Sequence, residues 1–132
     1  MTKKIILLAV VTFLIFNSCQ STVIWDDSIP ESQMASVIFQ NMNVTSFNGI
    51  SVNRFNNVMI PSGVTNITAD VSISHGGVQF ITRDMEFNYD FQAGRSYRVI
   101  GRAHDMRWGI SVFEGNELLA FIPFLEQPVF SR

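Results

Sequence analysis

Residues 84–99 read DMEFNYDFQAGRSYRV, and this stretch decides the fold. In its first half, apolar side chains occupy every second position: Met85, Phe87, Tyr89 and Phe91. A period of two is typical of a β-strand with one buried and one solvated face. The alternation resumes at Tyr97 and Val99, after a break that contains Gly94. The stretch therefore predicts an antiparallel hairpin whose aromatic face is buried by the rest of the domain.

Two registers keep the aromatic side chains of this hairpin on one face, because a slip of one residue would turn them to the opposite face. A three-residue loop at residues 92–94 places Tyr89 opposite Tyr97, and a loop two residues longer places Phe91 opposite Tyr97. The shorter loop is preferred, because Gly94 then ends it at a position where a left-handed backbone is common.

Either register also pairs opposite charges on the solvated face of the hairpin. Asp84 lies opposite Arg102 with the short loop, and Asp90 lies opposite Arg98 with the long one. Such a cross-strand pair contributes roughly 0.2–1 kcal/mol to stability.

Residues 1–18 are predicted to be a secretory signal. Lys3 and Lys4 precede an unbroken apolar run at residues 5–16. The run is shorter than the roughly 20 residues with which a helix crosses a bilayer, so a retained transmembrane anchor is the less favoured interpretation.

Residues 16–19, Phe-Asn-Ser-Cys, resemble the lipobox of bacterial lipoproteins, in which the cysteine becomes the lipidated first residue of the mature chain. Phe16 stands where leucine is usual, a looseness similar to that of spirochaetal lipoproteins. The alternative is an ordinary cleavage site that happens to lie beside Cys19.

Cys19 is the only cysteine, so the mature chain can form no internal disulfide and offers no thiolate cluster for zinc. Its stability is therefore expected to come from packing, for which the sequence supplies 12 phenylalanines and 2 tryptophans. The formal charge is −2 and no basic run occurs. Nucleic acid is excluded as a partner on this ground, since its binding needs clustered Lys and Arg.

Residues 19–35 are polar and show no sustained period, which predicts a tether, and residues 36–132 are predicted to be the folded domain. Outside the hairpin, strands are expected at residues 36–44, 50–52, 58–60, 65–73, 78–81, 108–113 and 118–124. Asn48-Gly49 predicts a tight turn between the first two of these strands. Strands spaced in this way, with turn signals between them, predict an all-β fold, a single antiparallel β-sandwich of Ig-like or transthyretin-like type with roughly 7–9 strands.

Four short motifs carry a resemblance to a protein family: residues 48–52 (NGISV), 60–63 (IPSG), 91–97 (FQAGRSY) and 108–109 (WG). Their spacing resembles that of small bacterial lipoproteins of uncharacterised function, built as β-sandwich modules, and the likeness spans most of the mature chain. Ser62 and Val64 depart from the usual form of the second motif, which is Ile-Pro-Ala-Gly followed by a polar residue or histidine. Because the motifs are turn and core residues, the resemblance implies a fold and transfers no catalytic or binding residue.

Three outward carboxylates, Asp84, Glu86 and Asp90, share one face of the predicted strand. They could hold a cation or act as an acid/base pair. A solvated face is favoured, because catalysis needs carboxylates in a pocket that drives their pKa values apart.

His75 and His104 are the only histidines, and neither has another His or a Cys at metal-ligand spacing. His104 and Asp105 come closest to a catalytic pair. No nucleophile motif accompanies them, and neighbouring strand residues are expected to point to opposite faces. The sequence therefore predicts no catalytic residue, metal ligand or cofactor.

These observations predict a non-enzymatic protein, anchored by lipid at Cys19 to a membrane of the bacterial cell envelope, at the outer membrane or cell surface, that binds an envelope or host protein. A second hypothesis is a small-ligand or carbohydrate carrier, because exposed aromatic side chains often mark recognition sites. A third is a hydrolase around His104. A bare sheet face favours the first, a concave aromatic patch the second, and a cleft that encloses His104 with a nearby Ser or Asp the third.

Overall fold

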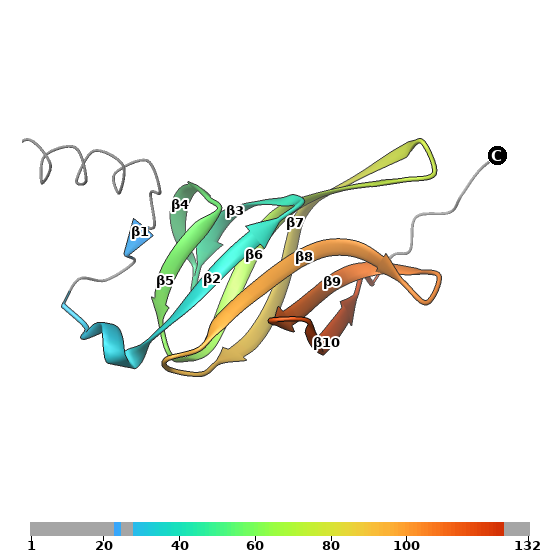
Figure 1. Ribbon diagram of the computed structural model, residues 1–132. Coiled ribbons are helices and arrows are strands. Elements are labelled where there is room, and N and C mark those ends of the chain that lie inside the picture. Colours follow the sequence, from blue (N-terminus) through green and yellow to red (C-terminus); the bar gives the residue numbers. More distant parts are fainter. Residues whose placement is uncertain (1–22, 25–27, 126–132) are drawn as a thin grey trace, which may run out of the picture.

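A computed structural model describes residues 23–24 and 28–125, which form two β-sheets packed face to face (Figure 1). The strands are β1 Val23–Ile24, β2 Met34–Gln40, β3 Met42–Phe47, β4 Ile50–Phe55, β5 Asn57–Pro61, β6 Gly63–His75, β7 Val78–Phe91, β8 Ser96–His104, β9 Arg107–Glu114 and β10 Glu117–Pro123. Sheet A has the order β1-β5-β2-β8-β9-β10, and sheet B has the order β4-β3-β6-β7. The prediction of an all-β sandwich is confirmed.

Sheet A is mixed rather than purely antiparallel. β2 runs parallel to β8, and the two-residue β1 runs parallel to β5, whereas the other neighbouring strands are antiparallel. Alternation of apolar and polar side chains reports which face of a strand is buried, but it carries no information on the direction of the neighbouring strand. The parallel pairs could therefore not be predicted from the sequence.

Residues 84–99 do not form the predicted hairpin. β7 pairs with β6 in sheet B, while β8 pairs with β2 and β9 in sheet A, so the chain between them crosses from one sheet to the other. Phe91 and Tyr97 still meet, because they enter the core from opposite sheets and their ring centroids lie 5.1 Å apart. The predicted cross-strand pairs are therefore wrong in both registers: Tyr89 with Tyr97, Phe91 with Tyr97, Asp84 with Arg102 and Asp90 with Arg98.

The crossing between β7 and β8 is a tight turn that contains Gly94, whose φ of +76° confirms the predicted left-handed backbone. The Arg95 N–H faces the Gln92 carbonyl at 3.4 Å, and the Gly94 N–H donates to the Met34 carbonyl at 2.9 Å. The Tyr97 hydroxyl accepts a hydrogen bond from the Gln92 N–H at 2.9 Å. The turn is thus held against the start of β2, which a hairpin would not require.

Residues 78–81 and 84–91, predicted as separate strands, form one continuous strand, β7. A β-bulge between them resets the alternation of inward and outward side chains. Arg83 and Asp84 together lie opposite the single residue Asp70 of β6. Asp84 has a φ of +54°, and its N–H donates to Asp70 Oδ1 at 3.0 Å. Phe80 and Phe87 are an odd number of residues apart, so a regular strand would turn them to opposite faces. The extra residue lets both pack against the core.

Residues 36–44, predicted as one strand, form β2 and β3 in different sheets. Asn41 lies between these strands with a φ of +59°, and its side-chain amide donates to the Gly101 carbonyl at 3.0 Å. Phe39 and Met42 are therefore both buried although they are not on alternate positions. The predicted turn between the first two strands is confirmed as a two-residue hairpin loop at Asn48-Gly49, with φ values of +50° and +79°.

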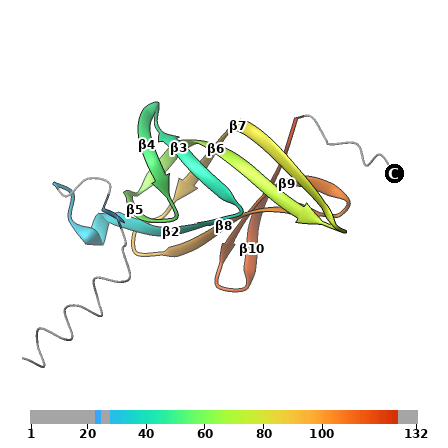
Figure 2. The same ribbon diagram turned by 90° about the horizontal axis from the view of Figure 1, so that it is seen from above.

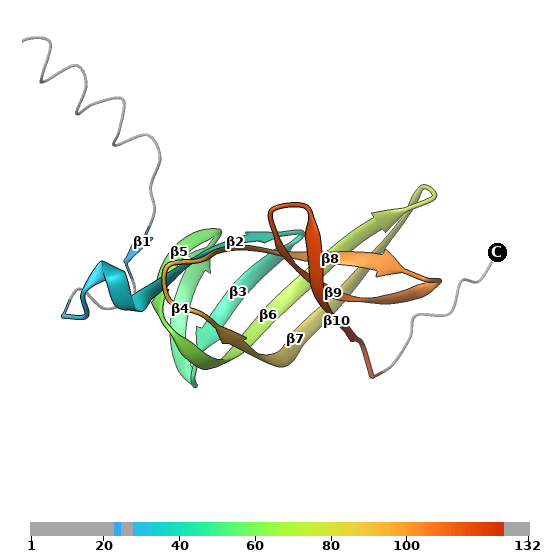
Figure 3. The ribbon, with the colours of Figure 1, turned by 60° about the horizontal axis from the view of Figure 1, so that its bottom comes forward.

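The core lies between the two sheets, and its described residues fall between Met34 and Phe124. The inward side predicted for residues 65–73 is confirmed by four buried side chains: Ile67, Ala69, Val71 and Ile73. Phe87 is only 4% exposed, whereas Tyr89 is half-buried. In Figure 3 the ribbon of β10 crosses those of β6 and β7, which belong to the opposite layer.

The described chain begins ahead of the predicted domain boundary. Val23 and Ile24 pair with β5, and a 3-10 helix at Glu31–Gln33 leads into β2, which starts with the buried Met34. The described residues contain no helix that is long and apolar enough to cross a membrane.

Candidate functional site

The outer face of sheet A presents arginine side chains packed on phenylalanine rings. On β8, Tyr97 and Val99 point into the core, so the alternating Arg98 and Arg102 point outward. Phe113 of β9 is directly opposite Arg98 and follows the core residue Val112, so it also points outward. Two adjacent strands therefore place cations and an aromatic ring on one surface.

The guanidinium groups lie over the aromatic rings at cation–π distance. The Cζ atoms of Arg98 and Arg102 lie 5.1 Å and 5.4 Å from the centroid of the Phe113 ring. On the next pair of strands, Arg107 Cζ lies 5.9 Å from the ring centroid of Phe121. Separations of up to about 6 Å are attractive for a cation over a ring. We call this surface the arginine face; it consists of Arg98, Arg102, Arg107, Phe113 and Phe121.

No arginine of this face is within ion-pair distance of a carboxylate in the described part of the chain. The ion pairs there join Arg95 to Glu114 at 3.7 Å and His104 to Asp105 at 3.4 Å. The Nε atom of Arg98 is buried without a hydrogen-bond partner. Two cations that converge on one ring without a counter-charge raise the local positive potential. The arginine face is therefore suited to bind an anionic group.

The outer face of sheet B carries the opposite charge. The carboxylates predicted to share one strand face, Asp84, Glu86 and Asp90, are all exposed. Glu86 Oε1 accepts a hydrogen bond from the Asn66 amide at 2.8 Å. The same amide donates to Asn88 Oδ1 at 2.8 Å. The described residues hold no group of three or more His, Cys, Asp and Glu side chains placed to bind a metal ion. These carboxylates therefore lie on a solvated face, where Glu86 is hydrogen-bonded to the Asn66 amide.

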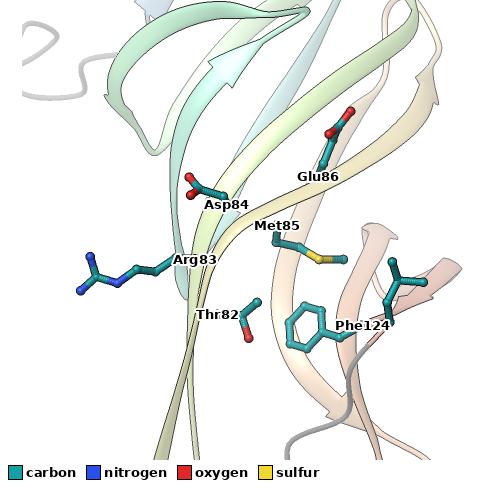
Figure 4. A pocket seen from close by; sticks show the side chains of 7 residues that line it. Thr82, Arg83, Asp84, Met85, Glu86 and Phe124 are labelled. Carbon is teal, nitrogen blue, oxygen red and sulfur yellow. The ribbon is translucent and has the colours of Figure 1, made fainter.

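A cavity of about 300 Å³ lies where the β7 bulge meets the end of β10 (Figure 4). Met85 and Thr82 lie on the side of β7 that faces Phe124, whereas Arg83 and Asp84 point away from it. The bulge explains this arrangement, because it returns the inward side of the strand to Met85 after Thr82. Asp84 and Glu86 both line the cavity, but Figure 4 shows their side chains pointing in different directions rather than at each other.

The two histidines, distant in the sequence, line one cavity of about 410 Å³. The hairpin tips of β6–β7 and β8–β9, which carry them, lie at the same end of the molecule (Figures 1 and 2). The ring of His75 meets the buried Trp108 edge-on at 5.8 Å. This meeting could not be predicted from the sequence, because it depends on how the two sheets pack.

His104 and Asp105 are in contact, so the expectation that they point to opposite faces is wrong. Asp105 opens a two-residue turn with a φ of +49° and therefore does not continue the alternation of β8. The cavity that they share with His75 is lined by no hydroxyl or thiol side chain. A cavity that holds His104 beside Asp105 is the feature that the hydrolase hypothesis expects, but its lining residues offer no hydroxyl or thiol nucleophile, so they supply a general base alone.

Comparisons of the chain with protein-family profiles, curated proteins and solved structures find no match. The resemblance to small bacterial lipoproteins and the lipidation of Cys19 stay predictions, and Cys19 and the signal at residues 1–18 lie outside the described residues.

The arginine face was missed at the level of sequence, although a signal was present. Residues 95–107 contain four arginines and a single carboxylate, Asp105. Arg98 and Arg102 also lie an even number of residues apart, which places them on the same side of a strand. The partner ring of Phe113 could not be assigned, because that requires the register of β8 against β9.

Proposed function

We propose that this chain is a lipid-anchored, non-enzymatic protein of the bacterial cell envelope whose β-sandwich is a binding module, and that the arginine face is its binding surface. The predicted signal at residues 1–18 and the lipobox-like cysteine at position 19 support the location. The observation that carries the binding surface is the convergence of Arg98 and Arg102 on Phe113 without a carboxylate partner among the described residues.

The packing of the guanidinium groups favours recognition. A free arginine side chain loses rotamer freedom on binding, at a cost of about 0.5–1.5 kcal/mol. Side chains already laid on a ring lose less, because their planar groups are partly ordered beforehand. Arginine and aromatic residues are also enriched at protein interfaces and at their energetic hot spots. The arginine face therefore combines charge with a preformed geometry.

The alternative of a small-ligand or carbohydrate carrier draws support from the cavity beside Trp108. Trp108, however, is buried in the core, and no aromatic residue is among the large apolar side chains exposed in the described part of the chain. The aromatic residues whose burial is described are thus used for packing, whereas Trp25 lies outside the described residues. The uncovered outer face of sheet A is the feature that favours a binding module.

Retention of envelope components on the immobilised domain tests the proposal. The chain from residue 19 onward, with Cys19→Ser, is compared with the double variant Arg98→Ser/Arg102→Ser. Arg83→Ser is the matched control, because Arg83 is exposed on sheet B. We expect components retained by the wild-type face and the control to be lost from the double variant. Equal retention by all three proteins would refute the arginine face as the binding surface.

A further inference from the structure

Exposed apolar side chains border the arginine face. Arg98 is flanked across the sheet by Ile38 of β2 on one side and by Phe113 of β9 on the other. Leu118 of β10 follows next to Phe113. Ile38 and Leu118 are exposed, and Met106, in the turn that leads to Arg107, is 97% exposed. The surface therefore joins cations to apolar side chains along its margin.

This combination distinguishes between anionic partners. A soluble anionic polymer would neutralise the arginines but would leave Met106 and Leu118 in water. A phospholipid surface satisfies both kinds of side chain, because its headgroups carry phosphate and the region beneath them is apolar. The apolar margin thus favours a membrane over a soluble polyanion.

The distribution of charge gives the domain an orientation on such a surface. The outward carboxylates Asp70, Glu86 and Asp90 lie on sheet B, on the far side of the core from the arginine face. Of the carboxylates close to the face in the sheet, Asp105 and Glu117 lie in or beside the turns at its margin, and Glu114, which follows Phe113, is paired with Arg95 at 3.7 Å. An anionic surface would therefore attract sheet A and repel sheet B.

We propose that the arginine face docks on an anionic phospholipid surface, with headgroup phosphates bound by Arg98, Arg102 and Arg107 and with Met106 among the headgroups. This inference rests on the proposed function, since it uses the same face, and it names the class of partner. An anchored domain needs little affinity of its own, because the tether makes docking an intramolecular step.

Sedimentation with lipid vesicles tests the inference. The chain from residue 19 onward with Cys19→Ser carries no lipid, so any membrane binding must come from the domain. We expect binding to vesicles of equal parts phosphatidylglycerol and phosphatidylcholine, and none to phosphatidylcholine alone. Binding should be lost at high salt, where the screening length falls from about 10 Å at 0.1 M to about 3 Å at 1 M.

Matched variants separate charge from folding. Arg98→Gln/Arg102→Gln should lower the partition coefficient about 30-fold, from roughly 1 kcal/mol for each arginine near an anionic surface. Arg98→Lys/Arg102→Lys keeps the charge and should stay within about 3-fold of wild type. Arg83→Gln, on the opposite sheet, should change binding by less than about 2-fold. Met106→Ser should weaken binding by a similar factor at each salt concentration at which the wild-type protein binds, because its contribution is not electrostatic.

Binding that does not depend on phosphatidylglycerol, or that survives Arg98→Gln/Arg102→Gln, would overturn the inference. Retention on an immobilised sulfated polysaccharide without vesicle binding would also overturn it, and would leave the arginine face as a surface for a soluble polyanion. Failure of the proposed function gives a different result: the wild-type protein and the Arg98→Ser/Arg102→Ser variant would then retain envelope components equally.

Discussion

Phe91→Ala removes the ring that joins the two sheets where the chain crosses from β7 to β8. Phe91 is fully buried, and its ring meets Tyr89 at 5.0 Å and Tyr97 at 5.1 Å in edge-to-face geometry. Truncation of a buried phenylalanine to alanine costs about 3–5 kcal/mol. The two aromatic contacts, each worth about 0.5–1.5 kcal/mol, place this site at the upper end of that range. Such a loss is large against the roughly 5–15 kcal/mol by which a domain of this size is stable.

Urea denaturation followed by the fluorescence of the buried Trp108 measures this loss. With an m-value of about 1.5 kcal/mol/M, the unfolding midpoint should fall by roughly 2–3 M. Tyr97→Phe is the control, because it keeps the ring and removes only the hydroxyl that accepts the hydrogen bond from Gln92. The control should cost about 1 kcal/mol. A midpoint for Phe91→Ala within error of wild type would refute the assignment of this ring to the junction between the sheets.

Three further predictions follow from backbone geometry and titration. Asp84→Gly should be neutral or stabilising and Asp84→Val destabilising by about 1–2 kcal/mol, because a β-branched side chain resists the φ of +54° at the bulge; thermal unfolding checks the opposite signs. Gly94→Val should destabilise strongly and Ala93→Ser should be nearly silent in the same assay, because Gly94 has a φ of +76° and Ala93 is exposed. Burial, with a smaller effect of Tyr97, raises the pKa of Tyr89 above its ordinary value of 10.0. The unfolded chain therefore loses this proton at a lower pH than the folded one, so the stability is complete below pH 10 and declines as pH rises from there toward the folded pKa. Tyr89→Phe should flatten this decline in Tm, and an unchanged slope would contradict the assignment.

The sequence predicted which side chains are buried far better than which strands are neighbours. Phe87 and Ile73 lie on the inward sides that their alternation indicated. Alternation cannot distinguish a hairpin from a crossing between sheets, because Phe91 and Tyr97 are buried together in both arrangements. The end of β2 could not be predicted either. The chain changes sheets at Asn41 through a left-handed backbone conformation, and the pattern of hydrophobic residues does not indicate such a kink.

Non-glycine residues with positive φ limited the prediction of the strands themselves. Asp84 sits at the bulge of β7, and Asp105 and Met106 form the turn between β8 and β9. Aspartate tolerates the left-handed region, but its presence alone does not require it. The continuous β7 and the contact of His104 with Asp105 were both missed on this account.

The candidate site was the least predictable part. Arg98 and Phe113 meet across two strands, and the cavity lined by His75 and His104 forms between two hairpins of different sheets. Both depend on register and on the packing of the layers, which the sequence does not display. The chemistry of the residues was visible, but their juxtaposition was not.

Lipidation of Cys19 is the claim on which the envelope location depends. Each buried methylene of an acyl chain contributes about 0.8 kcal/mol, and more than one chain gives stable attachment. Detergent phase partitioning with metabolic labelling by a fatty-acid analogue tests it in the intact chain. A non-ionic detergent is suitable, because it offers no anionic headgroup to the arginine face.

Wild-type protein should be labelled and should enter the detergent phase. Cys19→Ser should be unlabelled, should stay in the aqueous phase, and should unfold at the same temperature as the wild-type domain. Unlabelled wild-type protein in the aqueous phase would contradict the lipid anchor and the envelope function that is built on it.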